Sequence, residues 1–182
     1  MLWIVVGVVV VVALGAVVVY NRLVSLRQSV SNAQGDIDVQ LRQRADLVPQ
    51  LVETVKGYAA HEAGVLETLT KARTAVTQAA TPDQKMAAEG GLSRAIGGLF
   101  AVAEAYPDLK ASATMAQLSE ELSSTENRVA FARQAYNDAV MGYNVSRESF
   151  PGNVVAGSFS FTEAAPYDAA NEVERAPVRV AF

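Results

Sequence analysis

LWIVVGVVVVVALGAVVVY, residues 2–20, is the stretch that decides the fold of this chain. It contains no charged residue, and ten of its nineteen positions are valine. Nineteen helical residues rise about 28 Å, close to the roughly 30 Å hydrocarbon core of a bilayer. Leu2 and Trp3 at one end and Tyr20 at the other lie where aromatic rings favour lipid headgroups. We therefore predict a transmembrane anchor over residues 1–20, with the lipid bilayer as its partner.

A cleaved secretory signal is the alternative interpretation of this segment. Ala13–Ala16 resembles a small-residue cleavage site. No basic residue precedes the apolar stretch, however, and the stretch is longer than the apolar region of a usual signal peptide. Both features favour an uncleaved anchor. Arg22 and Arg27 follow the span, whereas no charged side chain precedes it, so the positive-inside rule places the N-terminus outside and the following domain in the cytoplasm.

Composition and charge limit what the rest of the chain can be. The 182 residues carry a net charge of −4 and include no cysteine. Acidic and basic residues are interspersed, without the basic stripe that neutralises phosphates, so we expect no nucleic-acid partner. The absence of cysteine excludes disulfides, thiolate metal sites and cysteine nucleophiles. Beyond residue 20, strong helix formers dominate, which favours an all-α fold.

Apolar residues recur every three or four positions from residue 21 onward, as they do in amphipathic helices. The first helix is predicted to end near Ala45, with Asp46 as the N-cap of a second helix that reaches about residue 80. Because Pro49 is also tolerated at a kink, one long helix bent there is the alternative.

Two proline boundaries predict the remaining helices. Thr81 and Pro82 are placed as N-cap and first position of a third helix. Tyr106-Pro107-Asp108 separates this helix from a fourth, which is predicted to run to about Ser149 and to end before Pro151-Gly152. The second, third and fourth helices are thus predicted to be joined by short connections.

Helices with short connections pack most simply as an antiparallel up-and-down four-helix bundle, which we predict for residues 21–150. The first helix is expected to continue from the transmembrane helix without a break. Heptad-like spacing leaves intermolecular coiled coils as the alternative. Gly90-Gly91 and Gly97-Gly98 weaken the third helix by up to about 1 kcal/mol per glycine. We attribute them to close packing against a neighbouring helix or to a frayed start.

Residues 151–182 form a C-terminal tail of a different kind. Apolar and polar residues alternate in Ser158–Phe161 and in Val178–Phe182. This alternation predicts two short extended segments, docked on the bundle or on another copy, with Phe159 and Phe161 buried. A disordered tail is the alternative.

No group of residues in the sequence indicates a catalytic, cofactor or metal site. His61 is the only histidine, and a zinc-protease motif fails because position 65 is valine. A serine nucleophile would need a histidine base on a strand–turn–helix elbow, which the sequence does not offer. We therefore expect neither an enzyme nor a cofactor. Polar residues on or beside the apolar stripes are expected to pair between helices and so to set helix register. They are Asp36, Asp38, Asp46, Glu62, Glu126, Asn127, Arg128 and Asn137.

Several strings occur in a specific order along the chain. They are YNRLVSLR (20–27), DLVPQLVETVKGYAAHE (46–62), EAYPDLKA (104–111), TENRV (125–129) and YNDAV (136–140). They resemble the LemA family of bacterial membrane proteins over nearly the whole chain. This resemblance implies a single N-terminal span, a long helical bundle and a place in the bacterial cell (inner) membrane, but no activity. By analogy, it makes His61-Glu62 and Glu126-Asn127-Arg128 candidate contacts with another protein.

These features favour a non-catalytic, membrane-anchored scaffold that self-associates as a homo-oligomer through its bundle and tail, with Phe159 and Phe161 as tail contacts. Confinement to a membrane raises effective concentration, so that weak lateral contacts suffice. An adaptor or regulator of another membrane protein, such as a protease or a sensor, is the first alternative. A bundle that binds a ligand through its carboxylates is the second.

Overall fold

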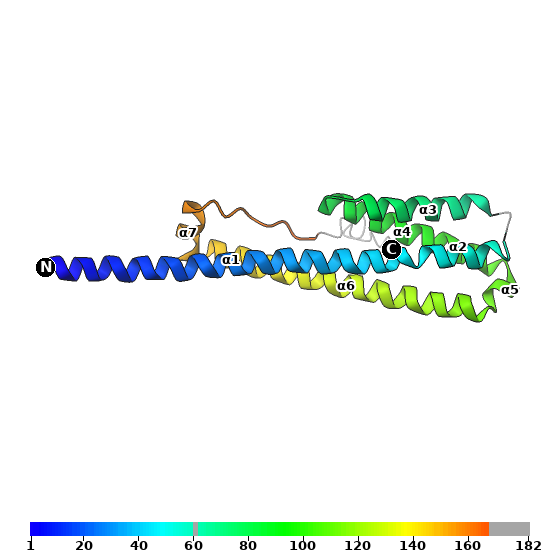
Figure 1. Ribbon diagram of the computed structural model, residues 1–182, viewed down its shortest axis with the longest axis horizontal. Coiled ribbons are helices and arrows are strands. Elements are labelled where there is room, and N and C mark those ends of the chain that lie inside the picture. The colour runs from blue at the N-terminus through cyan, green and yellow to red at the C-terminus, as the bar shows by residue number, and fades with distance from the viewer. Residues whose placement is uncertain (60–61, 168–182) are drawn as a thin grey trace, which may run out of the picture.

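The structure is a computed structural model that describes residues 1–59 and 62–167, and in this part of the chain all regular secondary structure is helical (Figure 1). The prediction of an all-α fold is confirmed for these residues. His61 and the second alternating segment, Val178–Phe182, lie outside them. The helices are α1 (Leu2–Asp46), α2 (Val48–Lys56), α3 (Ala63–Gln78), α4 (Pro82–Glu104), α5 (Pro107–Lys110), α6 (Ala113–Glu148) and α7 (Gly152–Ser158).

The long helices α1 and α6 run antiparallel and share the most extensive contact in the fold (Figure 1). Their buried faces follow the predicted three-and-four spacing. In α1 the buried apolar residues are Leu23, Val30, Ile37, Leu41 and Ala45. In α6 the buried residues are Met115, Leu118, Leu122, Thr125, Val129, Tyr136, Val140 and Tyr143. The amphipathic pattern therefore identified the contacting faces of both helices.

Helices α3 and α4 lie side by side at the end of the fold far from the N-terminus (Figure 1). The third predicted helix starts where expected. The Thr81 hydroxyl accepts from the Gln84 N–H, and the Gln84 side chain accepts from the Thr81 N–H, which completes a capping box. Pro82 occupies the first helical position. The predicted packing of residues 21–150 as a single antiparallel four-helix bundle stays a prediction.

The first part of α1 projects beyond the other helices (Figure 1). No side chain from residue 2 to residue 18 is buried, and the hydrophobic core begins with Leu23. Among the described helices, only the continuous Leu2–Lys56 helix is long and apolar enough to cross a membrane, judged by length and composition.

The predicted boundary near Ala45 coincides with the interruption between α1 and α2 at Leu47, but Asp46 ends α1 and is not the N-cap of a separate second helix. The alternative of one long helix describes this region better, because the helix continues from Leu2 to Lys56. Leu47 keeps helical angles, with φ −77° and ψ −19°, so α2 continues from α1. Pro49 fits because it lies in the first turn of α2, where an absent N–H breaks few helical bonds. The chain reverses later, between Lys56 and Ala63, so the predicted second helix is two helices.

Two further boundaries differ from the prediction. The fourth helix does not start at Asp108, because Ser112 adopts an extended conformation (ψ 127°) that separates the short α5 from α6. The tail does not begin as an extended segment either, because Gly152–Ser158 forms α7. Helix α6 ends at Glu148, before Pro151, as predicted, but Pro151 is also the N-cap residue of the next helix, α7.

The described part of the chain gives no support to close packing as the reason for the paired glycines of α4. A Cβ atom added at Gly90, Gly91, Gly97 or Gly98 would meet no atom of the described residues within 4 Å. Close packing against a neighbouring helix of the same chain therefore does not require them. A frayed start does not account for them, because all four lie well inside a capped helix.

Candidate functional site

Charged side chains join α4 to the two long helices. Arg44 of α1 is only 3% exposed, and its guanidinium donates to the Ser93 hydroxyl of α4 at 2.8 Å and lies 3.3 Å from Glu126 of α6. Lys85 of α4 lies 2.6 Å from the Asp38 carboxylate of α1. Polar residues beside the apolar stripes thus pair between helices, as expected for Asp38 and Glu126.

A second polar cluster joins α4, α6 and the tail. Glu89 of α4 is buried, and its carboxylate accepts from Arg133 of α6 at 2.8 Å and from the Tyr167 hydroxyl of the tail at 2.9 Å. The Arg133 guanidinium also lies over the Tyr167 ring. Burial raises the pKa of the Tyr167 phenol far above its usual value, and the Glu89 carboxylate raises it further.

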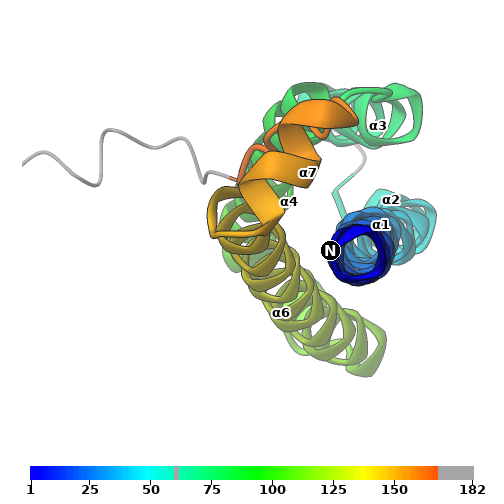
Figure 2. The same cartoon turned by 90° about the vertical axis from the view of Figure 1, so that its left-hand side faces the viewer.

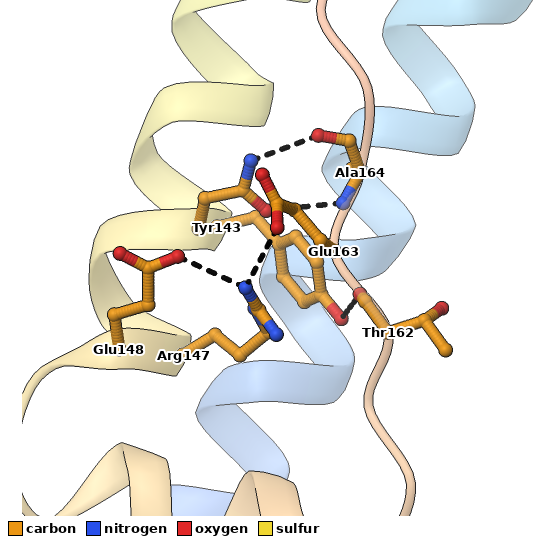
Figure 3. Close-up of polar contacts among 7 residues, drawn as sticks. Tyr143, Arg147, Glu148, Thr162, Glu163 and Ala164 are labelled. Atoms are coloured by element: carbon orange, nitrogen blue, oxygen red, sulfur yellow. Dashed lines mark hydrogen bonds and ion pairs between the residues drawn. The ribbon is translucent and has the colours of Figure 1, made fainter.

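The segment 159–167 runs along α6, and side chains of α6 form hydrogen bonds with its main-chain groups (Figures 1 and 3). Asn144 donates to the Ala164 carbonyl at 2.8 Å and accepts from the Ala164 N–H at 3.1 Å. One helical heptad earlier, Asn137 makes the same pair of bonds with Tyr167, at 3.2 and 2.7 Å. These asparagines bind backbone groups, so they fix the path of the segment with little dependence on its side chains.

Two tyrosines reinforce the asparagines. The Tyr143 hydroxyl donates to the Thr162 carbonyl at 2.8 Å, as Figure 3 shows, and the Tyr136 hydroxyl donates to the Ala165 carbonyl at 2.9 Å. Burial raises the pKa of the Tyr136 phenol. Arg147 bridges to Glu163 at 3.3 Å near the start of the segment. Together these side chains form a docking surface for the tail.

Sequence reasoning missed this surface, although the sequence contains a sign of it. The dipeptides Tyr136-Asn137 and Tyr143-Asn144 are seven residues apart, which places both on one face of a helix. Only Asn137 was singled out, as a register-setting residue. Its partner is the backbone of Tyr167, which lies thirty residues away and which helical periodicity could not reveal.

The predicted contact residues do not form one site. Glu62 precedes α3 and accepts from the Tyr106 hydroxyl at 3.3 Å. Partial desolvation of Tyr106, together with this carboxylate, raises the pKa of the Tyr106 phenol. Glu126 pairs with Arg44, whereas Asn127 and Arg128 are exposed elsewhere on the surface of α6.

The two predicted tail contacts have different environments. Phe161 is 6% exposed and packs edge-on against Tyr20, with the Arg27 guanidinium over its ring. Phe159 also touches Tyr20 but is 61% exposed, so the prediction that both phenylalanines are buried is wrong for Phe159. At the other end of the span, Leu2 and Trp3 are exposed.

An open groove of about 740 Å³ lies between α3 and α4. Small side chains predominate along it, with a few charged residues among them. Its lining residues are Glu62, Gly64, Val65, Thr68, Lys71, Ala72, Ala75, Gly91, Arg94, Ala95 and Gly98. Among the residues that the structure describes, no group of three or more potential metal ligands comes together.

Comparison with known proteins gives a consistent result. A family model described as the LemA family matches residues 33–182. Magnetosome protein MamQ 2 of Paramagnetospirillum magneticum is 26% identical over 171 residues, which cover 80% of this chain and 63% of that protein. Protein LemA of Metamycoplasma hominis is 25% identical over 159 residues, which cover 87% of this chain and 72% of that protein. The chain thus spans less than two thirds of the magnetosome protein, and neither name denotes an enzyme.

Proposed function

The chain belongs to the LemA family, and from this premise we propose that it is a non-catalytic scaffold whose copies self-associate in the bacterial cell membrane. Helix α1 anchors it, with the N-terminus outside and the helical domain, packed as a four-helix bundle, in the cytoplasm. The contact between copies is the open groove between α3 and α4.

The anchor is supported by the surface of α1. Its first eighteen residues include no buried side chain and, up to Tyr20, no charged one. An apolar surface of this extent on all sides of a helix is stable in lipid and unfavourable in water. Arg22 and Arg27 immediately after the span support the cytoplasmic orientation.

The groove is the observation that carries the proposal of self-association. Gly91 and Gly98 lie one heptad apart in its lining, and a Cβ atom at either would meet no atom of the described residues within 4 Å. Glycine inside a helix costs up to about 1 kcal/mol relative to alanine. Close approach of a helix from another molecule gives these glycines a use that no contact within the chain gives them.

A second copy is the occupant that the anchor favours. Copies anchored in one bilayer share an orientation and present their grooves at the same height, and confinement raises their effective concentration. A symmetric contact also requires a self-complementary surface. The groove lining supports such a contact, because it carries charges of both signs, Glu62 as well as Lys71 and Arg94.

Thiol crosslinking in vesicles tests the proposal directly, because the chain has no cysteine of its own. Ala75→Cys places a single thiol in the groove, and Ala130→Cys places one on the exposed surface of α6 as a matched control. With a short bis-maleimide, we expect covalent dimers of the Ala75→Cys protein and none of the Ala130→Cys protein.

A blocking variant links the crosslinks to the groove itself. Gly98→Leu adds an apolar side chain to the groove lining, and its Cβ atom would meet no atom of the described residues within 4 Å. Added to Ala75→Cys, it is expected to abolish dimer formation while leaving helical content unchanged. Equal crosslinking with and without Gly98→Leu, or no crosslinking at either cysteine, would refute self-association through this groove.

A further inference from the structure

We propose that α7 and its flanking residues form a second membrane contact, which lies in the lipid headgroup region beside the end of α1. The contact surface consists of Phe150, Val154 and Phe159 and is called the α7 foot. Its partner is the boundary between headgroups and acyl chains of the same bilayer that holds α1. This inference rests on the proposed anchor but is independent of self-association.

The position of α7 along α1 is the first observation. Helix α7 packs against α1 at the end of the apolar stretch (Figure 1). The Phe159 ring lies 4.9 Å from the ring of Tyr20, the last residue of the predicted span. The rings of Tyr20 and Phe159 therefore lie at the same level, where the hydrocarbon core ends and the headgroup region begins.

The orientation of α7 is the second observation. Figure 2 looks from the N-terminal end of α1 and shows α7 lying across the direction of that helix. A helix with this orientation lies in the plane of the membrane surface. It buries one face, formed by Gly152, Val155 and Ala156, against the protein. Gly152 allows the close approach, because a Cβ atom there would overlap the Ser146 carbonyl oxygen.

Three large apolar side chains are exposed in this region, beside the small polar residues Asn153, Ser158 and Ser160. Phe150 is 83% exposed, Val154 60% and Phe159 61%. Two phenylalanines this exposed within ten residues are unfavourable in water, because transfer of such side chains to an apolar phase is favourable. Since both flank a helix beside the membrane anchor, lipid is the apolar phase that lies within reach of them.

The charge pattern of the segment agrees with a lipid partner. Residues 149–162 contain no charged side chain. Glu148 and Glu163 flank this uncharged segment, and the Arg147 guanidinium lies 2.9 Å from the first carboxylate and 3.3 Å from the second, so the charged groups are gathered in one cluster at its edge. Arg22 and Arg27 of α1 follow the span, where cations favour an anionic membrane surface. Aromatic side chains such as Phe150 and Phe159 at this level are compatible with contact at the membrane interface.

Tryptophan fluorescence with brominated phospholipids tests the α7 foot. Trp3 is the only tryptophan, so a Trp3→Phe background permits a single reporter at each new position. The reporters are Phe150→Trp and Phe159→Trp in the foot and Phe131→Trp as a control, which is 71% exposed on α6. In full-length protein in vesicles, we expect bromolipid to quench both foot reporters and to leave the control unquenched.

The unmodified protein separates failure of this inference from failure of the anchor, because Trp3 reports insertion of α1 itself. Quenching of Trp3 together with unquenched emission from Phe150→Trp would overturn the α7 foot while leaving the anchor intact. Blue-shifted but unquenched emission from Phe150→Trp would also overturn it, in favour of coverage by a second copy. A nitroxide on Val154→Cys gives an independent measurement: we expect it to be more accessible to oxygen than to a water-soluble nickel complex.

Discussion

Replacing Asn144 with alanine is expected to release the tail locally from α6. The substitution removes two hydrogen bonds to Ala164, at 2.8 and 3.1 Å. A net contribution of about 1 kcal/mol for each bond gives a loss of about 2 kcal/mol. Because about 1.4 kcal/mol corresponds to a tenfold change, the tail should open about 30 times more often. Asn137→Ala removes the equivalent pair at Tyr167 and should have an effect of the same size.

Hydrogen exchange is the appropriate assay, because the perturbed groups are amide hydrogens. The Ala164 N–H donates to Asn144, and the Tyr167 N–H donates to Asn137. Exchange at these amides should accelerate about 30-fold in each single variant, for a loss of about 2 kcal/mol. The two asparagines lie about 10 Å apart along α6, so their effects should be nearly additive in the double variant.

Asn127→Ala is the matched control, because Asn127 is exposed on the same helix. The substitution changes helix propensity by the same amount as Asn144→Ala. We expect it to leave exchange in the tail unchanged. If Asn144→Ala exchanged at the wild-type rate while the helices stayed intact, the reasoning would be refuted. Apolar docking of Phe161 and Tyr167 would then account for the position of the tail.

Other substitutions test separate parts of the fold. Gly152→Ala should lower the thermal unfolding temperature, because its Cβ would overlap a backbone carbonyl of α6, whereas Gly142→Ala, with open space around it, should not. Raising the pH above about 10 should lower the free energy of unfolding, because the pKa of Tyr167 is higher in the folded protein than in the unfolded chain. Denaturant titrations at pH 8 and 11 measure this loss of stability, which Tyr167→Phe should reduce. Arg44→Ala should lower the free energy of unfolding by about 2–4 kcal/mol through lost packing and hydrogen bonding. Glu126→Gln should change it by less than about 0.5 kcal/mol in the same urea titration, because Glu126 is 61% exposed.

Periodicity predicted helices better than it predicted their ends. The buried faces of α1 and α6 follow from apolar spacing alone, because only one face of each helix can contact the core. The interruption beside Asp46 was predicted, but the N-cap role of Asp46 was wrong for a physical reason. An N-cap residue starts a separate helix only where the backbone leaves the helical region, and at Leu47 it does not leave it.

The polar contacts were predictable in kind but not in partner. A carboxylate beside an apolar stripe needs a cation, which Asp38 finds in Lys85. The sequence does not reveal which cation, since 47 residues separate the two. The docked tail was harder still, because Asn137 and Asn144 bind backbone groups, which every residue carries. Phe159 is exposed at the end of α7, a helix that ends at Ser158. The alternation of apolar and polar residues predicted an extended segment there and so did not reveal this position.

The tail connects the anchor mechanically to the far helices. At one end Phe161 packs against Tyr20, where the span ends, and at the other end Tyr167 binds Glu89 of α4. Between these points the segment is hydrogen-bonded to α6. A tilt of α1 relative to α4 would have to break one of these contacts. Under the proposed self-association, these contacts, together with the direct pairs Lys85–Asp38 and Arg44–Ser93, would hold the α3–α4 groove at a constant height above the membrane, which lateral contact between identically anchored copies requires.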